Sequence, residues 1–291
     1  MFHILTDTSA NLPTRYLRKH DIGVIPIYYM IDGEEFACLD TDAFDGKSYY
    51  ENIRKGTRVT TSQINPLQYM EFFEPYLAAG EDIVFIAMSS GISSSYLSAL
   101  SAAENLKQQY PAGKILVIDS LGASLGQGLL VAAAVQQKER GKTAEETAGY
   151  IQMLRQRMYQ VFTVDDLTHL RRTGRCSNIS AAVGTVLQIK PLLKGNEKGQ
   201  IVTFDKVRGR KRSVEALAEK YDELAIDPGE HTVGIAHADC PKEAQYLISL
   251  LKRNRPPKKI MTVCYEPVTG SHVGPGTLAL FFFGGPDVRR H

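Results

Sequence analysis

The chain has 291 residues, of which 43% are apolar and 23% charged, which is ordinary for a globular protein long enough for two domains. Its formal net charge of +2 gives no overall reason to expect nucleic acid or an anionic membrane as a partner. The four cysteines form no CxxC pair and have no histidine at metal-ligand spacing, so we expect reduced thiols and no metal site. No signal-peptide pattern and no membrane-spanning run is found, which predicts a soluble, cytoplasmic protein without stable membrane insertion.

The first elements alternate between strands, loops and helices. Residues 2–6 predict a strand, followed by a polar loop and a helix that reaches residue 20. Residues 24–31 are β-branched and aromatic and predict one strand, which Asp32-Gly33 joins to a second strand over 34–38. We then expect a helix over 40–55, an extended hydroxyl-rich segment over 59–63 and a helix over 66–78.

Two consecutive strand-loop-helix units come next. Residues 83–88 form a continuous apolar run, typical of a strand covered by helices on both faces, and a helix is expected over 96–110. The pattern repeats with a strand over 115–118 and a helix over 123–138. Such units predict parallel strands with right-handed crossovers and a ligand at the carboxyl ends of the strands.

The alternation changes after a helix expected over 144–158, so we place a domain boundary there, giving domains 1–158 and 159–291. The second half predicts a mixed sheet with helices. Its expected strands cover 161–164, 189–193, 200–204, 233–236, 260–265 and 278–283, and its expected helices cover 165–172, 180–187, 213–224 and 242–251.

A run of hydroxyl side chains over residues 89–95 stands where a helix is expected to begin. Unpaired backbone N–H groups and the helix dipole favour an anion at such a position, so a carboxylate or phosphate would fit. Simple helix capping needs one serine and is the alternative interpretation. The glycines at 122, 126 and 128 do not support a nucleotide site, because they lie within a helix and no acidic ribose partner follows.

A glycine-rich stretch over 269–277 carries one imidazole, His272, among hydroxyls. It is either a turn between two strands or a place where backbone and a ring nitrogen approach a ligand. Serine–histidine catalysis with His272, or with His237 and Asp239, is weakened by the absence of a GxSxG elbow. Clustered hydroxyls favour hydrogen bonding to a ligand over nucleophilic attack.

Two basic clusters, over 171–175 and 206–212, stand out against the small net charge. They are either a cationic helix end and a solvated turn, or a docking surface for an acidic partner or a phosphorylated product. Nucleic acid is disfavoured as a partner because no aromatic side chains interleave the charges.

Several short motifs together resemble the DegV family of bacterial fatty-acid-binding proteins, nearly from end to end. They are Thr6-Asp7-Thr8-Ser9 with Leu12-Pro13, Thr61-Ser62-Gln63, Ser89-Ser90 with Ile92-Ser93 and Tyr96, Val117-Ile118-Asp119-Ser120, Asp166-Leu167 with Arg171-Arg172-Thr173-Gly174-Arg175, Lys190-Pro191, and Gly270-Ser271-His272-Val273-Gly274-Pro275-Gly276. The chain departs from the family at Ile64-Asn65, where Pro-Ser is frequent, and at Ser94-Ser95, where Gly-Thr is frequent.

The resemblance implies a two-domain α/β fold, with a parallel-sheet α/β/α N-terminal domain, a mixed-sheet C-terminal domain and a ligand cleft between them. It implies a carrier of a long-chain fatty acid that serves a fatty acid kinase, whose separate catalytic subunit makes an acyl phosphate for phospholipid synthesis. The carboxylate would be held by Thr61, Ser62, Ser93, Ser94 and His272, and Arg172, Arg175 and Arg208 are candidates for contacting the phosphate or the partner. No cofactor beyond the bound fatty acid is implied. A hydrolase or acyl transferase that uses His272 with a serine is the alternative.

Burial of an acyl chain would drive binding without a covalent bond. At about 0.8 kcal/mol per methylene, a chain of about fourteen would contribute on the order of 11 kcal/mol before ordering and association costs. Small residues either line a tunnel for the chain or only permit close helix packing; they are Ala123, Ala181, Ala182 and Gly184.

Overall fold

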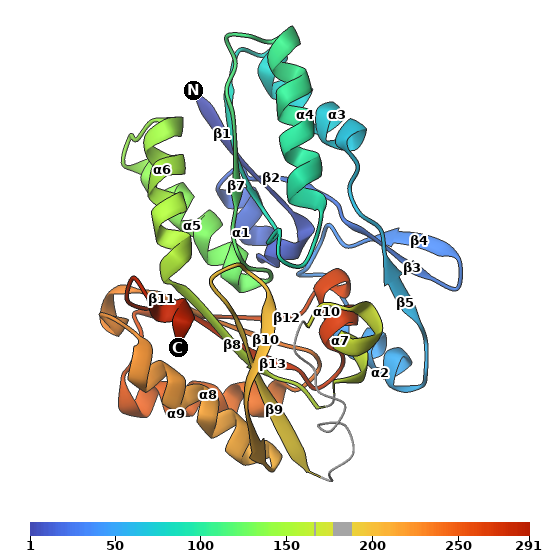
Figure 1. Cartoon of the computed structure of the whole chain (residues 1–291), viewed down its shortest axis with the longest axis vertical. Coiled ribbons are helices and arrows are strands. Elements are labelled where there is room, and N and C mark those ends of the chain that lie inside the picture. The colour runs from blue at the N-terminus through green and yellow to red at the C-terminus, as the bar shows by residue number, and fades with distance from the viewer. Residues whose placement is uncertain (166, 177–187) are drawn as a thin grey trace.

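The structure, a computed structural model, describes residues 1–165, 167–176 and 188–291. A four-stranded parallel sheet in the order β2-β1-β6-β7 forms the first half of the chain (Figure 1). Its strands are β1 (Phe2–Asp7), β2 (Gly23–Ile25), β6 (Asp82–Ala87) and β7 (Ile115–Asp119). Its helices are α1 (Thr14–Lys19), α3 (Pro66–Ala78), α4 (Ser95–Gln109), α5 (Leu125–Glu139) and α6 (Ala144–Leu154), with a 3-10 turn η1 (Thr8–Ala10) after β1.

The packing of strand β6 explains the continuous apolar run over residues 83–88. Val84 and Ile86 pack into the cluster that contains α5 and α6, whereas Ile83 and Phe85 pack into the cluster that contains α3 and α4. Both faces of the strand are therefore covered by helices, as the sequence predicts. The expected helix over 66–78 is confirmed at both ends by α3, which Asn65 and Gln68 begin with a reciprocal capping box.

A small antiparallel sheet, β4-β3-β5, lies beside the parallel one. It contains β3 (Tyr28–Ile31), β4 (Glu34–Ala37) and β5 (Val59–Thr61), and α2 (Gly46–Arg54) comes between β4 and β5 in the chain. The predicted hairpin turn is confirmed, since Asp32 and Gly33 both have positive φ, 51° and 88°. The single strand expected over 24–31 is wrong. β2 and β3 belong to different sheets, and Pro26, which has no N–H to donate, falls between them.

A six-stranded mixed sheet forms the second half, in the order β10-β9-β8-β13-β11-β12, and only β11 and β12 run parallel. Its strands are β8 (Met158–Thr163), β9 (Ile189–Gly195), β10 (Ile201–Arg208), β11 (Thr232–His237), β12 (Lys259–Cys264) and β13 (Leu278–Phe283). Its helices are α7 (Thr168–Thr173), α8 (Arg210–Leu224), α9 (Pro241–Asn254) and α10 (Pro267–Val273), with 3-10 turns η4 (Pro228–Glu230) and η5 (Val288–Arg290). The chain thus has the two-domain α/β architecture expected from its sequence.

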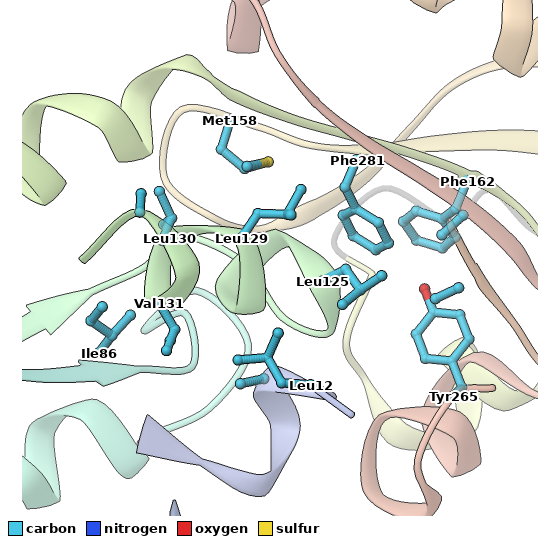
Figure 2. Packing of buried hydrophobic residues seen from close by; sticks show 14 of the residues in the cluster. Leu12, Ile86, Leu125, Leu129, Leu130, Val131, Met158, Phe162, Tyr265 and Phe281 are labelled. Atoms are coloured by element: carbon cyan, nitrogen blue, oxygen red, sulfur yellow. The ribbon is translucent and has the colours of Figure 1, made fainter. Parts of the chain in front are cut away.

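Helix α5 connects the two sheets. Figure 2 shows Leu129 and Leu125 directed toward Met158 and Phe281 of the mixed sheet, whereas Val131 points toward the parallel sheet. Helices α8 and α9 pack on the other face of the mixed sheet in a separate apolar cluster. One helix buried against both sheets explains why its hydrophobic residues surround it rather than forming a single stripe.

Several expected boundaries differ from the structure. The helix expected over 40–55 begins only at Gly46, where Asp45 accepts a hydrogen bond from the Ser48 N–H, because Asp40 forms a local turn with the next residues. The helix expected over 144–158 ends at Leu154, followed by the turn η2 (Arg155–Arg157) and by β8. The helix expected over 180–187 lies outside the described residues. The domain boundary near residue 158 coincides with the first residue of β8 and stays a prediction.

Candidate functional site

A cavity of about 480 Å³ lies where the loops that follow β6 and β7 face β5, β8, β13 and α10. Its position at the carboxyl ends of β6 and β7 is the one expected for a parallel sheet. Apolar side chains from both halves of the chain line it, among them Met88, Ile92, Phe162, Val268 and Phe281. Ala123 also lines it, whereas the predicted lining residues Ala181, Ala182 and Gly184 lie outside the described residues.

The serine loop, residues 89–95, forms one side of the cavity. Some of its hydroxyls already form hydrogen bonds within the protein. Ser89 Oγ donates to the carbonyl of Gly199 at 2.9 Å, and Ser90 Oγ donates to Asp119 at 2.5 Å. Ser93 Oγ accepts the backbone N–H of Ser95 at 3.2 Å in a local turn, whereas Ser94, the N-cap residue of α4, makes no side-chain cap hydrogen bond. Ser93 and Ser94 nevertheless line the cavity at the start of α4, where the first N–H groups of a helix lack intrahelical partners.

His272 and Thr61 contact each other at the cavity wall. Thr61 ends β5, His272 lies in the last turn of α10, and Thr61 Oγ1 is 2.9 Å from His272 Nε2. Burial, together with the nearby charges of Arg175 and Arg172, lowers the pKa of His272 to about 4. The imidazole is therefore neutral at physiological pH. Its other nitrogen, Nδ1, is buried and has no hydrogen-bond partner in the described part of the chain.

The stretch over 269–277 is only partly the turn that its composition suggests. Residues up to Val273 belong to α10, and the turn follows at Gly274 and Gly276, whose φ angles are 83° and 78°. Glu266 caps this helix by accepting the N–H groups of Val268 and Thr269 at 2.6 and 2.7 Å. Its complete burial raises the pKa of Glu266 to about 7. The helix cap thus orients the segment that carries His272.

The other predicted residues divide between the cavity and the surface. Ser62 lines the cavity and donates to the carbonyl of Tyr28 at 3.4 Å. Arg175 also lines it and donates to the carbonyl of Thr173. Arg172 is exposed in the last turn of α7, and Arg208 is exposed at the end of β10, outside the cavity lining. The structure therefore brings together six of the eight predicted residues, namely Thr61, Ser62, Ser93, Ser94, Arg175 and His272.

Gln63 and Gln160 also line the cavity, and neither was assigned a role in the site from the sequence. Gln63 follows two predicted residues and donates from Nε2 to Ser98 Oγ at 2.8 Å, so its position in the hydroxyl-rich segment is a signal that could have found it. Gln160 lies in β8 and donates to the carbonyl of Leu121 at 2.9 Å. It lies in a mostly apolar strand that also contains the buried Thr163, so its position gives no local signal of a site.

The described residues contain neither a metal cluster nor a membrane-spanning helix. No group of three His, Cys, Asp or Glu side chains among the described residues is placed to hold a metal ion. Within the same described ranges, no helix has the length and hydrophobicity needed to cross a membrane.

These features define a two-domain α/β protein with a ligand cavity lined by hydroxyls and apolar side chains. The chain belongs to the DegV family, since the family model described as "Uncharacterised protein, DegV family" matches residues 1–284. A DegV domain-containing protein of Clostridium perfringens is 38% identical over 283 residues, covering 97% of each chain. A similar protein of Lactococcus lactis is 34% identical over 280 residues, covering 96% of each.

Solved structures agree with this assignment. A fatty acid binding DegV family protein of Streptococcus agalactiae has a TM-score of 0.85 and 28% identity, covering 98% of this chain and 99% of its own. DegV of Bacillus subtilis, described as a fatty acid binding protein, has a TM-score of 0.83 and 26% identity with the same coverage.

Proposed function

We propose that this chain binds a long-chain fatty acid in the cavity and presents it, in the cytoplasm, to the catalytic subunit of a fatty acid kinase. Thr61, Ser62, Ser93, Ser94 and His272 hold the carboxylate, and the acyl chain lies among the apolar side chains. The acyl phosphate that the kinase makes would feed phospholipid synthesis. The chain itself acts as a carrier and has no catalytic residue.

The observation that carries this proposal is the pair of Thr61 and His272 at the wall of a cavity that both polar and apolar side chains line. When the Thr61 hydroxyl donates to Nε2, the ring hydrogen is on Nδ1, a buried donor that has no hydrogen-bond partner among the described residues. A buried carboxylate requires several such donors, and the serine loop supplies further hydroxyls. The fatty acids bound by family members of solved structure support this choice of ligand.

The cavity also suits the rest of such a ligand. Its volume of about 480 Å³ falls within the range of about 300–1,000 Å³ typical of small-molecule sites. Phe162 and Phe281, from adjacent strands of the mixed sheet, line it. Removal of each methylene from water at this surface contributes about 0.8 kcal/mol, so chain burial supplies most of the affinity.

A hydrolase or acyl transferase that uses His272 is less well supported. A general base works best with a pKa near the working pH, whereas the pKa of His272 is about 4. Within the described residues, no carboxylate contacts Nδ1 to orient the ring as the third member of a triad. Thr61 is the hydroxyl that contacts His272, and the hydroxyls of Ser93 and Ser95 bind each other at 3.0 Å.

Organic extraction of the purified protein, followed by mass spectrometry, tests the proposal. We expect about one fatty acid per chain, and a marked loss of it in Thr61→Val and His272→Asn. Arg253→Ala, a change of an exposed helix residue, serves as the control and should retain the wild-type amount. Recovery of no fatty acid, with hydrolysis of an acyl ester that requires His272, would establish the enzyme instead.

The kinase part of the proposal rests on the exposed cations Arg172 and Arg208, and on Arg175 at the cavity. Charged rim residues govern the association rate and the docking of an acidic partner or phosphate. With a purified bacterial fatty acid kinase subunit, Arg172→Ala and Arg208→Ala should lower acyl phosphate formation by about tenfold while fatty acid binding stays within about twofold. Equal loss of binding and transfer would contradict this division of roles.

A further inference from the structure

Arg289, close to the end of the chain, is 2% exposed, and every hydrogen bond that its guanidinium donates to the described residues goes to a backbone carbonyl. Nε donates to Asn196 at 3.0 Å, Nη1 to Met158 at 2.7 Å and Nη2 to Leu121 at 2.6 Å. Burial lowers the pKa of Arg289 to about 10, so the side chain still carries its charge at neutral pH. A buried cation is costly, and this one joins three segments that are far apart in the sequence.

The segment that carries Arg289 is itself fixed to the mixed sheet. Lys194 Nζ donates to the carbonyls of Arg289 and Arg290 at 3.2 and 2.9 Å. Arg290 Nε forms an exposed ion pair with Glu197 at 2.7 Å. The backbone around Arg289 therefore has its own anchors, which do not depend on the guanidinium.

Two of the accepting segments form walls of the cavity. Leu121 lines it in a strained conformation with φ of 55°, and its carbonyl accepts hydrogen bonds from both Arg289 and Gln160. Asn196 begins the β9–β10 turn, where its carbonyl also accepts the N–H of Gly199 at 3.0 Å. Gly199 lines the cavity as well. The guanidinium thus fixes the loop after β7 and the β9–β10 turn relative to each other.

The β9–β10 turn in turn packs on the serine loop. The Gly199 carbonyl accepts the Ser89 hydroxyl at 2.9 Å, and a methyl group on Gly199 would collide with Ser89 Oγ. A methyl group on Gly91 would lie 2.6 Å from the Gly199 backbone. The serine loop and the β9–β10 turn therefore pack closely together, and this contact between the two halves of the chain closes one side of the cavity.

We propose that Arg289 is a positioning residue that holds the β9–β10 turn and the Leu121 loop against the serine loop and thereby slows ligand release. The inference rests on the proposed function, because the ligand whose release it controls is the fatty acid. Arg289 contacts no part of the ligand in this scheme. Its effect is exerted through the carbonyls of Leu121 and Asn196.

Release of cis-parinaric acid, a fluorescent fatty acid, from the full chain into excess albumin measures this effect. Arg289→Lys should raise the dissociation rate about tenfold, because an ammonium group cannot reach three separate carbonyls as a guanidinium does. Arg253→Ala, a change of an exposed cation in α9 outside the cavity lining, is the control and should leave the rate near that of the wild type.

A second variant tests the same contact from the other side. Gly199→Ala moves the turn away from Ser89 and should raise the release rate with Arg289 intact. Gly141→Ala is its matched control, since Gly141 also has a positive φ, 76°, but has open space around it. The double variant Arg289→Lys/Gly199→Ala should release no faster than the faster single variant, because both changes open one contact.

The outcomes separate this inference from the proposed function. A wild-type protein that binds no fatty acid overturns the function. Normal binding with an unchanged release rate in Arg289→Lys overturns the positioning role alone, as does a fully additive double variant. Urea unfolding of each variant identifies a merely structural role, which would lower stability without changing the release rate. If Arg289→Lys does not fold, Ser89→Ala decides, because an unchanged release rate there overturns the proposal.

Discussion

His272 should make the ligand-free protein less stable in acid, and His272→Asn should remove this part of the pH dependence. The ring is partly buried at the wall of the cavity, and the positive charges of Arg175 and Arg172 add to the desolvation penalty for protonating it. Its pKa is therefore about 4 in the folded protein, compared with about 6.5 in an unfolded chain.

The sign follows from where the proton binds. Below pH 6.5 the unfolded chain protonates His272 while the folded protein does not, so the free energy of unfolding falls as the pH falls. The stabilisation is fully present above pH 6.5 and is lost by about pH 4. Since a tenfold difference in proton affinity corresponds to about 1.4 kcal/mol, the total loss is about 3 kcal/mol.

Urea unfolding of the wild type and of His272→Asn at pH values from 7 to 4.5 provides the measurement. The quantity to compare is the difference in unfolding free energy between the two proteins, because other titrating groups contribute equally to both. We expect the wild type to lose between about 2 and 3 kcal/mol relative to the variant over this range. Parallel curves would show that His272 titrates normally and would refute the reasoning from burial and charge.

The remaining predictions concern Glu266 and two glycines. Burial raises the pKa of Glu266 to about 7, so the free energy of unfolding should fall by about 3 kcal/mol as the pH rises from 4.5 to 7. Glu266→Gln should abolish this fall. It should also lower the free energy of unfolding by about 1 kcal/mol, because the helix cap is weakened. An equal effect of Glu266→Gln at pH 5 and pH 8 would contradict this. Gly234→Ala places a methyl group 2.8 Å from Leu125 Cβ and should destabilise the protein by about 1–3 kcal/mol in thermal unfolding. Gly149→Ala adds a methyl group in open space within α6 and should stabilise the protein by up to about 1 kcal/mol in the same measurement. If both variants changed the stability in the same direction, the space around each glycine would not determine the effect of the added methyl group.

The sequence predicts those elements whose signal is local. The apolar run of β6 and the capped helix α3 could be located because their hydrophobicity and caps lie within the segments themselves. Helix α10 could not, because it is short and contains Gly270. A methyl group at Gly270 would collide with the hydroxyl of Tyr50 from α2, so a contact between distant segments determines this position.

The sequence indicates the candidate site only in part. Ser93 follows β6 of the parallel sheet, where the carboxyl ends of the strands predict a ligand, whereas Thr61 ends β5 of another sheet and was assigned to the site only through the resemblance to the DegV family. Which hydroxyls are already engaged could not be predicted, since partners such as Gly199 for Ser89 lie far away in the sequence. Arg289 gave no signal for the same reason, because its acceptors are backbone carbonyls of other segments.

The neutral state of His272 suits reversible binding of the proposed carboxylate. An empty cavity that contains a neutral ring avoids the cost of a buried charge, while Arg172 and Arg175 contribute a positive potential from less buried positions. A carboxylate within about 4–6 Å would raise the pKa of the ring by about 1–3, which strengthens the pair as the ligand enters. Arg175→Ala should therefore raise the pKa of His272 in the ligand-free protein and weaken fatty acid binding at the same time. The first effect is visible by NMR titration of the ring and the second by displacement of cis-parinaric acid. A raised pKa with unchanged affinity would show that the potential from Arg175 does not reach the ligand.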